Sequence, residues 1–250
     1  MPVPAAPGRL RRTAVAIAAA LALVAGAVLL LGTRTDAMDW SSPHRVPHAE
    51  GQLDPDFHAP DLDGFYSSQV VEPDPETWTR VRPSGDYRVL LLAAGRSRRV
   101  AQDPQVATLV AAARKWAKAE GRVQLKVRYL SDPRTFIRDL DDAAKHDHAD
   151  LIMTAGNALV EPVAAVSANY AGEDPQQFLV LGAEVAEPTA NIAATDWTGS
   201  AYLGEGLPES HFYDPRAVTA PRAYAALRAG VAAVLTGYRS VIVRIPAERY

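Results

Sequence analysis

Between residues 87 and 246 the chain alternates short, continuously apolar runs with longer segments in which apolar residues recur at helical spacing. The short runs are typical of strands buried on both faces, and the longer segments are typical of helices with one buried face. Expected strands cover 87–95, 122–130, 150–156, 177–184, 191–196 and 240–246. Expected helices cover 103–120, 132–147, 157–170 and 221–237.

Residues with known capping preferences mark the borders of these helices. Asp103 and Pro104 are typical of an N-cap and a first helical residue, and Gly121 is typical of a helix end. A second Asp-Pro pair opens the segment 132–147, and Asn157 is the expected cap of the third helix. The caps therefore agree with the boundaries that the apolar pattern gives.

This order of strands and helices predicts an α/β fold with a doubly wound, Rossmann-like parallel sheet, because parallel neighbours need helical crossovers and these are nearly always right-handed. Sheets of this kind bind ligands in the loops that leave the carboxyl ends of their strands. The segment 150–196 carries three of the predicted strands and the loops that follow them.

An uncharged stretch of apolar residues, 13–32, follows three arginines near the N-terminus. A helix of this length spans roughly 30 Å, the thickness of the hydrocarbon core of a bilayer. We expect residues 13–32 to be a retained transmembrane anchor and residues 1–12 a basic cytoplasmic tail, which places the rest outside the cytoplasm of a bacterial cell as the C-terminal part of a single-pass membrane protein. The alternative is a signal peptide cleaved near 35–37, which would leave a secreted protein.

Two segments lack a sustained apolar period. Residues 33–86 are rich in Pro, His and Asp and are expected to form an extracytoplasmic stalk and lead-in that cannot fold alone. Residues 205–219 interrupt the lobe, predicted over 87–250, as an irregular insert.

Composition narrows the classes of function. The 250 residues have 48% hydrophobic and 22% charged content, which is typical of a globular protein, and a formal net charge of −3. No basic stripe indicates nucleic-acid binding. Cysteine is absent, so the sequence excludes disulfides, thiolate metal sites, a cysteine nucleophile and a lipid anchor on cysteine.

Polar and small residues at the predicted strand ends are the candidate ligand-binding set. Arginines can bind an anionic group, an amide at a helix start can meet a ligand oxygen, a carboxylate can accept hydrogens from ribose or an amine, and an indole can stack on a base or sugar. The set is Arg96, Ser97, Gly156, Asn157, Gly182, Glu184, Asp196 and Trp197. Some of these residues also have a purely structural interpretation: Arg96 in a solvated loop, Asn157 as a plain N-cap, Asp196 as a capping residue and Trp197 as an interface residue.

The motifs of common enzymes are not met. No glycine-rich phosphate loop follows a strand, and the glycines near residue 200 have the wrong spacing. The run His146-Asp147-His148-Ala149-Asp150 spells H-x-H-x-D but sits at a helix end with Leu151 where a further His is needed. Neither Ser97 nor Ser210 lies in a nucleophile elbow. We therefore expect no catalytic residue, no metal and no cofactor.

Several segments resemble the basic membrane protein family of extracytoplasmic solute-binding proteins, which includes purine-nucleoside receptors of ABC transporters. The stretch 149–184 is similar to the family's strand, glycine turn, helix and following strand, and TGSAYLGEG at 198–206 resembles its Gly-Ser-aromatic-Leu-Ala-Gly stretch. The resemblance implies the first lobe of a type 1 periplasmic-binding-protein fold, a small-molecule ligand that is nucleoside-like, and an ABC permease as partner.

The sequence departs from that family in three places. The first loop, GRSRRVAQDPQ, lacks the family's Phe and Asn ligand motif; the insert at 205–219 interrupts a helix; and only the first strand of a second lobe is present. The chain is therefore expected either to be truncated or to have kept one lobe for another use. Two functions follow: a membrane-anchored solute-binding protein for uptake or sensing, or an exported structural or partner-binding domain that has lost the ligand site.

Overall fold

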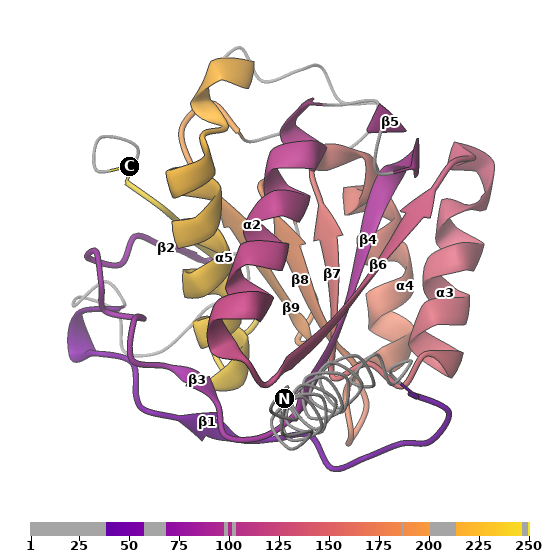
Figure 1. The fold of residues 1–250 in the computed structure, drawn as a ribbon, viewed down its shortest axis with the longest axis horizontal. Coiled ribbons are helices and arrows are strands. Elements are labelled where there is room, and N and C mark those ends of the chain that lie inside the picture. The colour runs from indigo at the N-terminus through magenta and orange to yellow at the C-terminus, as the bar shows by residue number, and fades with distance from the viewer. Residues whose placement is uncertain are drawn as a thin grey trace, which may run out of the picture. The chain divides into compact units, whose positions relative to one another are not determined.

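Strands and helices alternate from residue 87 onward in the predicted order (Figure 1). The structure, a computed structural model, describes residues 39–57, 69–97, 100–101, 104–186, 188–200, 214–246 and 250. The strands are β1 (Ala49–Glu50), β2 (Gln69–Val71), β3 (Arg82–Pro83), β4 (Tyr87–Ser97), β5 (Val100–Ala101), β6 (Val123–Leu130), β7 (Leu151–Ala155), β8 (Gln177–Leu181), β9 (Ile192–Asp196) and β10 (Val241–Arg244). The helices are α2 (Pro104–Glu120), α3 (Phe136–His146), α4 (Val160–Ser167) and α5 (Ala220–Leu235), with 3-10 turns η1 (Pro55–Phe57), η2 (Pro133–Thr135), η3 (Asn157–Leu159), η4 (Ala168–Tyr170) and η5 (Pro215–Ala217).

The main sheet is parallel in the order β6-β4-β7-β8-β9-β10-β2. The short strand β5 adds an antiparallel pairing to the end of β4. The predicted α/β architecture with a parallel sheet is thereby confirmed. Its order places the ends of β7, β8, β9 and β10 next to one another along one edge.

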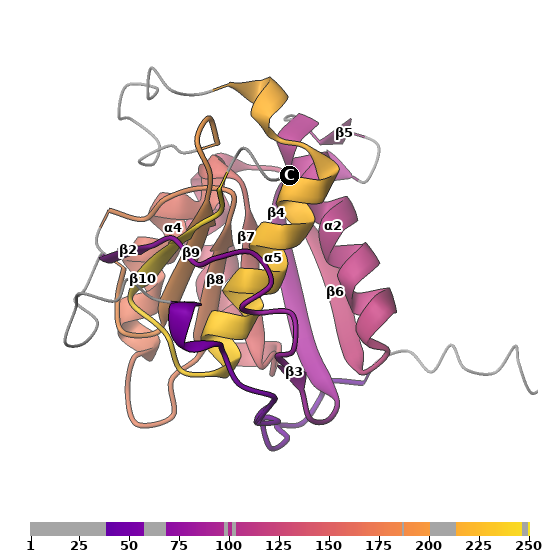
Figure 2. The ribbon, with the colours of Figure 1, turned by 90° about the vertical axis from the view of Figure 1, so that its left-hand side faces the viewer.

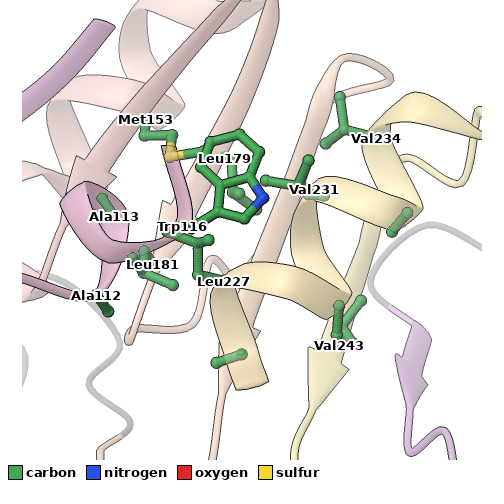
Figure 3. Packing of buried hydrophobic residues seen from close by; sticks show 14 of the residues in the cluster. Ala112, Ala113, Trp116, Met153, Leu179, Leu181, Leu227, Val231, Val234 and Val243 are labelled. Atoms are coloured by element: carbon green, nitrogen blue, oxygen red, sulfur yellow. The ribbon is translucent and has the colours of Figure 1, made fainter. Parts of the chain in front are cut away.

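Each central strand contributes alternate residues to two separate cores, because successive side chains point to opposite faces of a sheet. On one face, Leu91, Met153 and Leu179 pack with α2 and α5, and on the other Leu92, Ile152 and Val180 pack with α3 and α4. Figure 2 shows α2 and α5 side by side over the same face of the sheet. Figure 3 shows Trp116 of α2 between Met153, Leu179 and Leu227, all of them buried.

One glycine allows α5 to approach the sheet closely. A Cβ built on Gly230 would lie 2.5 Å from Thr195 Cγ2 and 2.8 Å from Leu179 Cδ1. Those distances are shorter than atoms in contact allow. Helix α5 therefore lies so close to the sheet that only glycine fits at position 230.

The described part of the predicted lead-in packs on this lobe. Trp40, Phe57, Val71 and Trp78 are each at most 4% exposed and belong to the two cores. β2 extends the sheet beside β10, as Figure 2 shows, and β1 pairs with β3. These residues lie in one compact unit with the sheet, Trp40–Tyr250. The apolar residues that make these contacts are too widely spaced to produce a period in the sequence.

Two predictions fall partly or wholly outside the described residues. Within the described ranges no helix is both long enough and apolar enough to cross a membrane, and the anchor expected at 13–32 lies outside them. Of the insert predicted at 205–219, residues 214–219 are described: η5 follows Asp214, which accepts a hydrogen bond from the backbone N–H of Arg216.

Candidate ligand-binding site

The loops after β7, β8, β9 and β10 are joined stepwise by backbone hydrogen bonds. The N–H of Gly156 donates to Leu181 O at 2.9 Å, that of Gly182 to Thr195 O at 2.8 Å, and that of Ile245 to Asp196 O at 2.9 Å. These bonds continue the parallel ladders past the last strand residues. The carboxyl ends of these four strands are therefore joined at the edge where open α/β sheets bind ligands.

Two glycines form the turns on this edge. Gly156 and Gly182 have φ of 77° and 78°, a left-handed conformation that side chains other than glycine rarely adopt. A Cβ on Gly182 would also lie 3.1 Å from Leu109 Cδ1. The N-cap of η3 is Gly156, so the prediction that Asn157 caps this helix is wrong; Asn157 is the first residue of the turn.

The centre of the edge is an ion-pair cluster around Arg244. Its Nη2 donates to Asp196 Oδ2 at 3.0 Å and to Glu184 Oε1, and its Nη1 lies 3.8 Å from Glu72 Oε1. The side chain of Asp196 is 1% exposed and that of Glu184 is 18% exposed. Three carboxylates thus face one guanidinium, which leaves the cluster with excess negative charge when all are ionised.

The pKa of Asp196 responds to its burial and to the charged groups around it. Burial raises the pKa of Asp196 to about 7, and a side-chain hydrogen bond between its protonated form and Glu184 is the second cause, although Arg244 acts in the opposite direction. Burial by itself lowers the pKa of Arg244, but Asp196 and Glu184 raise it on balance. Arg244 therefore stays charged, while Asp196 takes up a proton near neutral pH.

Two predicted site residues hold buried polar atoms without a hydrogen-bond partner among the described residues. These atoms are Oδ1 of Asn157 and Nε1 of Trp197. An unsatisfied buried polar group costs about 1–3 kcal/mol, so each needs an explanation such as a bound water or ligand. One is an acceptor and the other a donor, and they flank the Gly182 turn.

The burial of Trp197 differs from the expectation for a stacking residue. Its side chain is 0% exposed and belongs to the core under α2 and α5. Stacking on a base or sugar, as predicted, would require the ring to become exposed. Its backbone N–H is held by Ser200 Oγ at 2.9 Å, so the following turn is fixed locally.

Of the first predicted loop, 95–105, the structure describes the backbone of residues 96–97 and 100–101 but not their side chains. Arg96 and Ser97 continue β4, and Ser97 pairs with Val100 of β5. Their side chains lie outside the described part of the chain.

Of the predicted site residues, Glu184 and Asp196 are therefore joined through Arg244, and Gly156 and Asn157 lie on the turn that follows β7.

Sequence reasoning missed Arg244 and Glu72. A signal for Arg244 was present, because it ends an apolar strand and a parallel register places it opposite Asp196. Glu72 gave no such signal. It follows β2, a three-residue strand in a segment without apolar periodicity.

The two aspartates of the H-x-H-x-D run, Asp147 and Asp150, contact different partners. Asp147 pairs with Arg128 at 2.7 Å, whereas Asp150 accepts from the backbone N–H of Arg88 at 2.7 Å and lies 3.3 Å from His44 Nδ1. Burial raises the pKa of Asp150. Asp150 and His44 line a cavity of about 420 Å³ at the amino ends of the strands, the opposite edge from the candidate site.

Comparisons with known proteins give structural likenesses alone. No family model matches the chain, and no curated protein matches it. A solute-binding protein of an ABC transporter system from Aeropyrum pernix K1 has 22% identity and a TM-score of 0.39 over 45% of this chain and 29% of its own. A solute-binding protein of an ABC transporter system from Conexibacter woesei DSM 14684 has 20% identity and a TM-score of 0.34 over 45% and 35%.

A periplasmic ribose ABC transporter structure from the same Conexibacter strain has 14% identity and a TM-score of 0.36 over 65% of this chain and 55% of its own. The chain therefore spans between about a third and a half of the length of these three structures. Similarity at this level identifies neither the family of the chain nor a ligand.

Proposed function

We propose that this chain is an extracytoplasmic solute-binding lobe, held at the bacterial membrane by residues 13–32, that binds a small polar molecule at the carboxyl edge of its sheet. The observation that carries the proposal is the pair of unsatisfied buried atoms, Asn157 Oδ1 and Trp197 Nε1. They follow β7 and β9, on either side of the Gly182 turn, at the edge where parallel sheets bind ligands.

The chemistry of the cluster selects ligands rich in hydrogen-bond donors. Glu184 and Asp196 are acceptors, and the cluster has more carboxylates than cations. A ribose or a nucleoside supplies hydroxyl donors to such groups and an acceptor for the indole N–H. An ABC permease is the partner that such a lobe would serve.

The test is isothermal titration calorimetry together with thermal shift, using nucleosides, ribose and amino acids. A ligand at one hundred times its Kd stabilises the folded state by about 2.7 kcal/mol, which is readily measured. We expect Asn157→Ala and Glu184→Gln to weaken binding. The matched control is Asn169→Ala, since Asn169 is exposed on the opposite edge. A folded sample that responds to none of these compounds contradicts the proposal.

Membrane attachment is tested separately. We expect the full chain to remain in the membrane fraction after alkaline wash and a chain lacking residues 1–32 to be released. N-terminal sequencing that finds a start near residue 37 would instead indicate a cleaved signal peptide.

A second candidate is a partner-binding domain without a ligand site. It is favoured by one observation: Asp196 is buried and its carboxylate is already occupied by Arg244. In that case, crosslinking in cells would recover a cell-envelope protein and no permease.

A further inference from the structure

A second cavity, of about 480 Å³, lies between α2 and α5, away from the carboxyl edge. Its size is within the range of small-molecule sites, about 300–1,000 Å³. Small side chains create the hollow: Ala111 and Ala112 of α2 face Ala225 of α5 across it. The methyl groups leave the space between the two helices open, and the larger side chains of Trp78 and Tyr224 also line it.

Three charged side chains line this cavity: Lys115, Glu76 and Arg228. Lys115 and Glu76 both line it, and both are exposed residues. Arg228 also lines it, but its guanidinium lies 3.5 Å from Glu120 and donates to Thr79 O at 2.7 Å. Among the described residues, neither Lys115 nor Glu76 has a salt-bridge partner.

Local contacts hold the side chain of Lys115 and the backbone of Glu76. Lys115 Nζ lies 4.5 Å from the centre of the Tyr224 ring, a cation–π contact between the two helices. The carbonyl of Glu76 accepts from both the N–H of Thr79, at 3.1 Å, and its hydroxyl, at 2.9 Å. The cavity therefore presents an ammonium held against the Tyr224 ring and a glutamate whose backbone is held by Thr79, beside an apolar interior.

We propose that this cavity binds a zwitterion with an apolar side chain, of the hydrophobic α-amino acid type. The ligand carboxylate pairs with Lys115, the ligand ammonium pairs with Glu76, and the apolar side chain lies against Ala112 and Ala225. A free amino acid carries both charges at neutral pH, because its carboxyl and amino groups titrate far on either side of it. This site is separate from the carboxyl edge and does not depend on the function proposed for that edge.

Three compounds with the same ring test the assignment by isothermal titration calorimetry on the full chain. L-phenylalanine carries both charges, 3-phenylpropanoate lacks the ammonium, and phenethylamine lacks the carboxylate. We expect phenylalanine to bind at least about tenfold more tightly than either analogue, since each loses one charge-assisted contact. No binding of phenylalanine to folded protein, or equal affinity for the three compounds, overturns the proposal.

Charge variants separate the two contacts. Lys115→Met is expected to weaken phenylalanine and phenylpropanoate about tenfold and to leave phenethylamine unchanged, and Glu76→Gln is expected to do the reverse. Lys118→Met, exposed on the same helix outside the cavity, is the matched control. Phenylalanine affinity that is unaltered by both cavity variants contradicts the assignment.

A filling variant tests the location. Ala111→Phe places a ring over the cavity from an exposed helical position and is expected to abolish binding of phenylalanine. Ala119→Phe, exposed on the same helix but outside the cavity, is expected to bind as the parent does. Binding that survives Ala111→Phe places the ligand elsewhere and overturns the proposal. Circular dichroism confirms that each variant is folded.

Discussion

Arg244 and Asp196 are paired across two adjacent parallel strands, with Nη2 of the arginine 3.0 Å from Oδ2 of the aspartate. The pair sits at the carboxyl ends of β10 and β9, and Asp196 is 0% exposed. The arginine therefore stabilises a charge that burial by itself would disfavour.

Replacing Arg244 by Met should destabilise the protein at neutral pH. The buried carboxylate loses its cation, for which losses of about 3–5 kcal/mol are typical, and we expect the lower end because Asp196 can take up a proton. The measurement is urea unfolding followed by circular dichroism. Arg216→Met is the control, since that side chain is 90% exposed and pairs locally with Asp214. Equal losses in the two variants would contradict a special role for Arg244.

The raised pKa of Asp196, about 7, predicts a pH dependence of stability. An acid whose pKa is higher in the folded state than in the unfolded state binds more protons when folded, so stability falls as pH rises from about 4 to about 7 and is level above that. We expect the difference in unfolding free energy between the parent and Asp196→Asn to follow this course. Urea titrations at a series of pH values measure it. A difference independent of pH would show that Asp196 does not titrate in this window.

Asn191 should be sensitive to an isosteric change. Its Nδ2 donates to the carbonyls of Ser167, Tyr170 and Gln176 at 3.0, 3.1 and 2.9 Å, which closes the connection from α4 to β8. In Asn191→Asp a carboxylate faces these carbonyls, and we expect a loss of about 3 kcal/mol. Asn169→Asp, at an exposed position, should change stability little. Thermal unfolding of the two variants distinguishes them.

Gly230 should not tolerate a methyl group. Alanine favours helices, but here its Cβ would meet Thr195 and Leu179, so we expect Gly230→Ala to cost about 2 kcal/mol through overpacking. Gly172→Ala is the matched control, because no atom lies within 4 Å of a Cβ built there. A Gly230→Ala protein that is as stable as the control would mean that α5 moves away from the sheet without penalty.

Among the described residues from 87 onward, the apolar pattern predicted the strands and α-helices except the two-residue strand β5, which falls in an expected polar loop. The runs around Leu91 and Ile152 alternate between two cores, and a strand that is buried on both faces has to be apolar throughout. The pattern placed Gly156 and Gly182 within the ends of the expected strands 150–156 and 177–184, whereas both lie just past those strands in left-handed turns.

Tertiary structure alone decided which polar residues meet. Glu72 reaches Arg244 from a three-residue edge strand, and Trp40, Phe57 and Trp78 enter the cores from a segment without periodicity. Contacts of this kind depend on strand order and on single side chains, neither of which leaves a repeat in the sequence. The sequence by itself determined the layers of the lobe and the edge where strands end, because local burial dictates residue type. Only the folded chain decided that Asp196 is buried against Arg244 and that Trp197 lies in the core, because those positions follow from packing between distant segments.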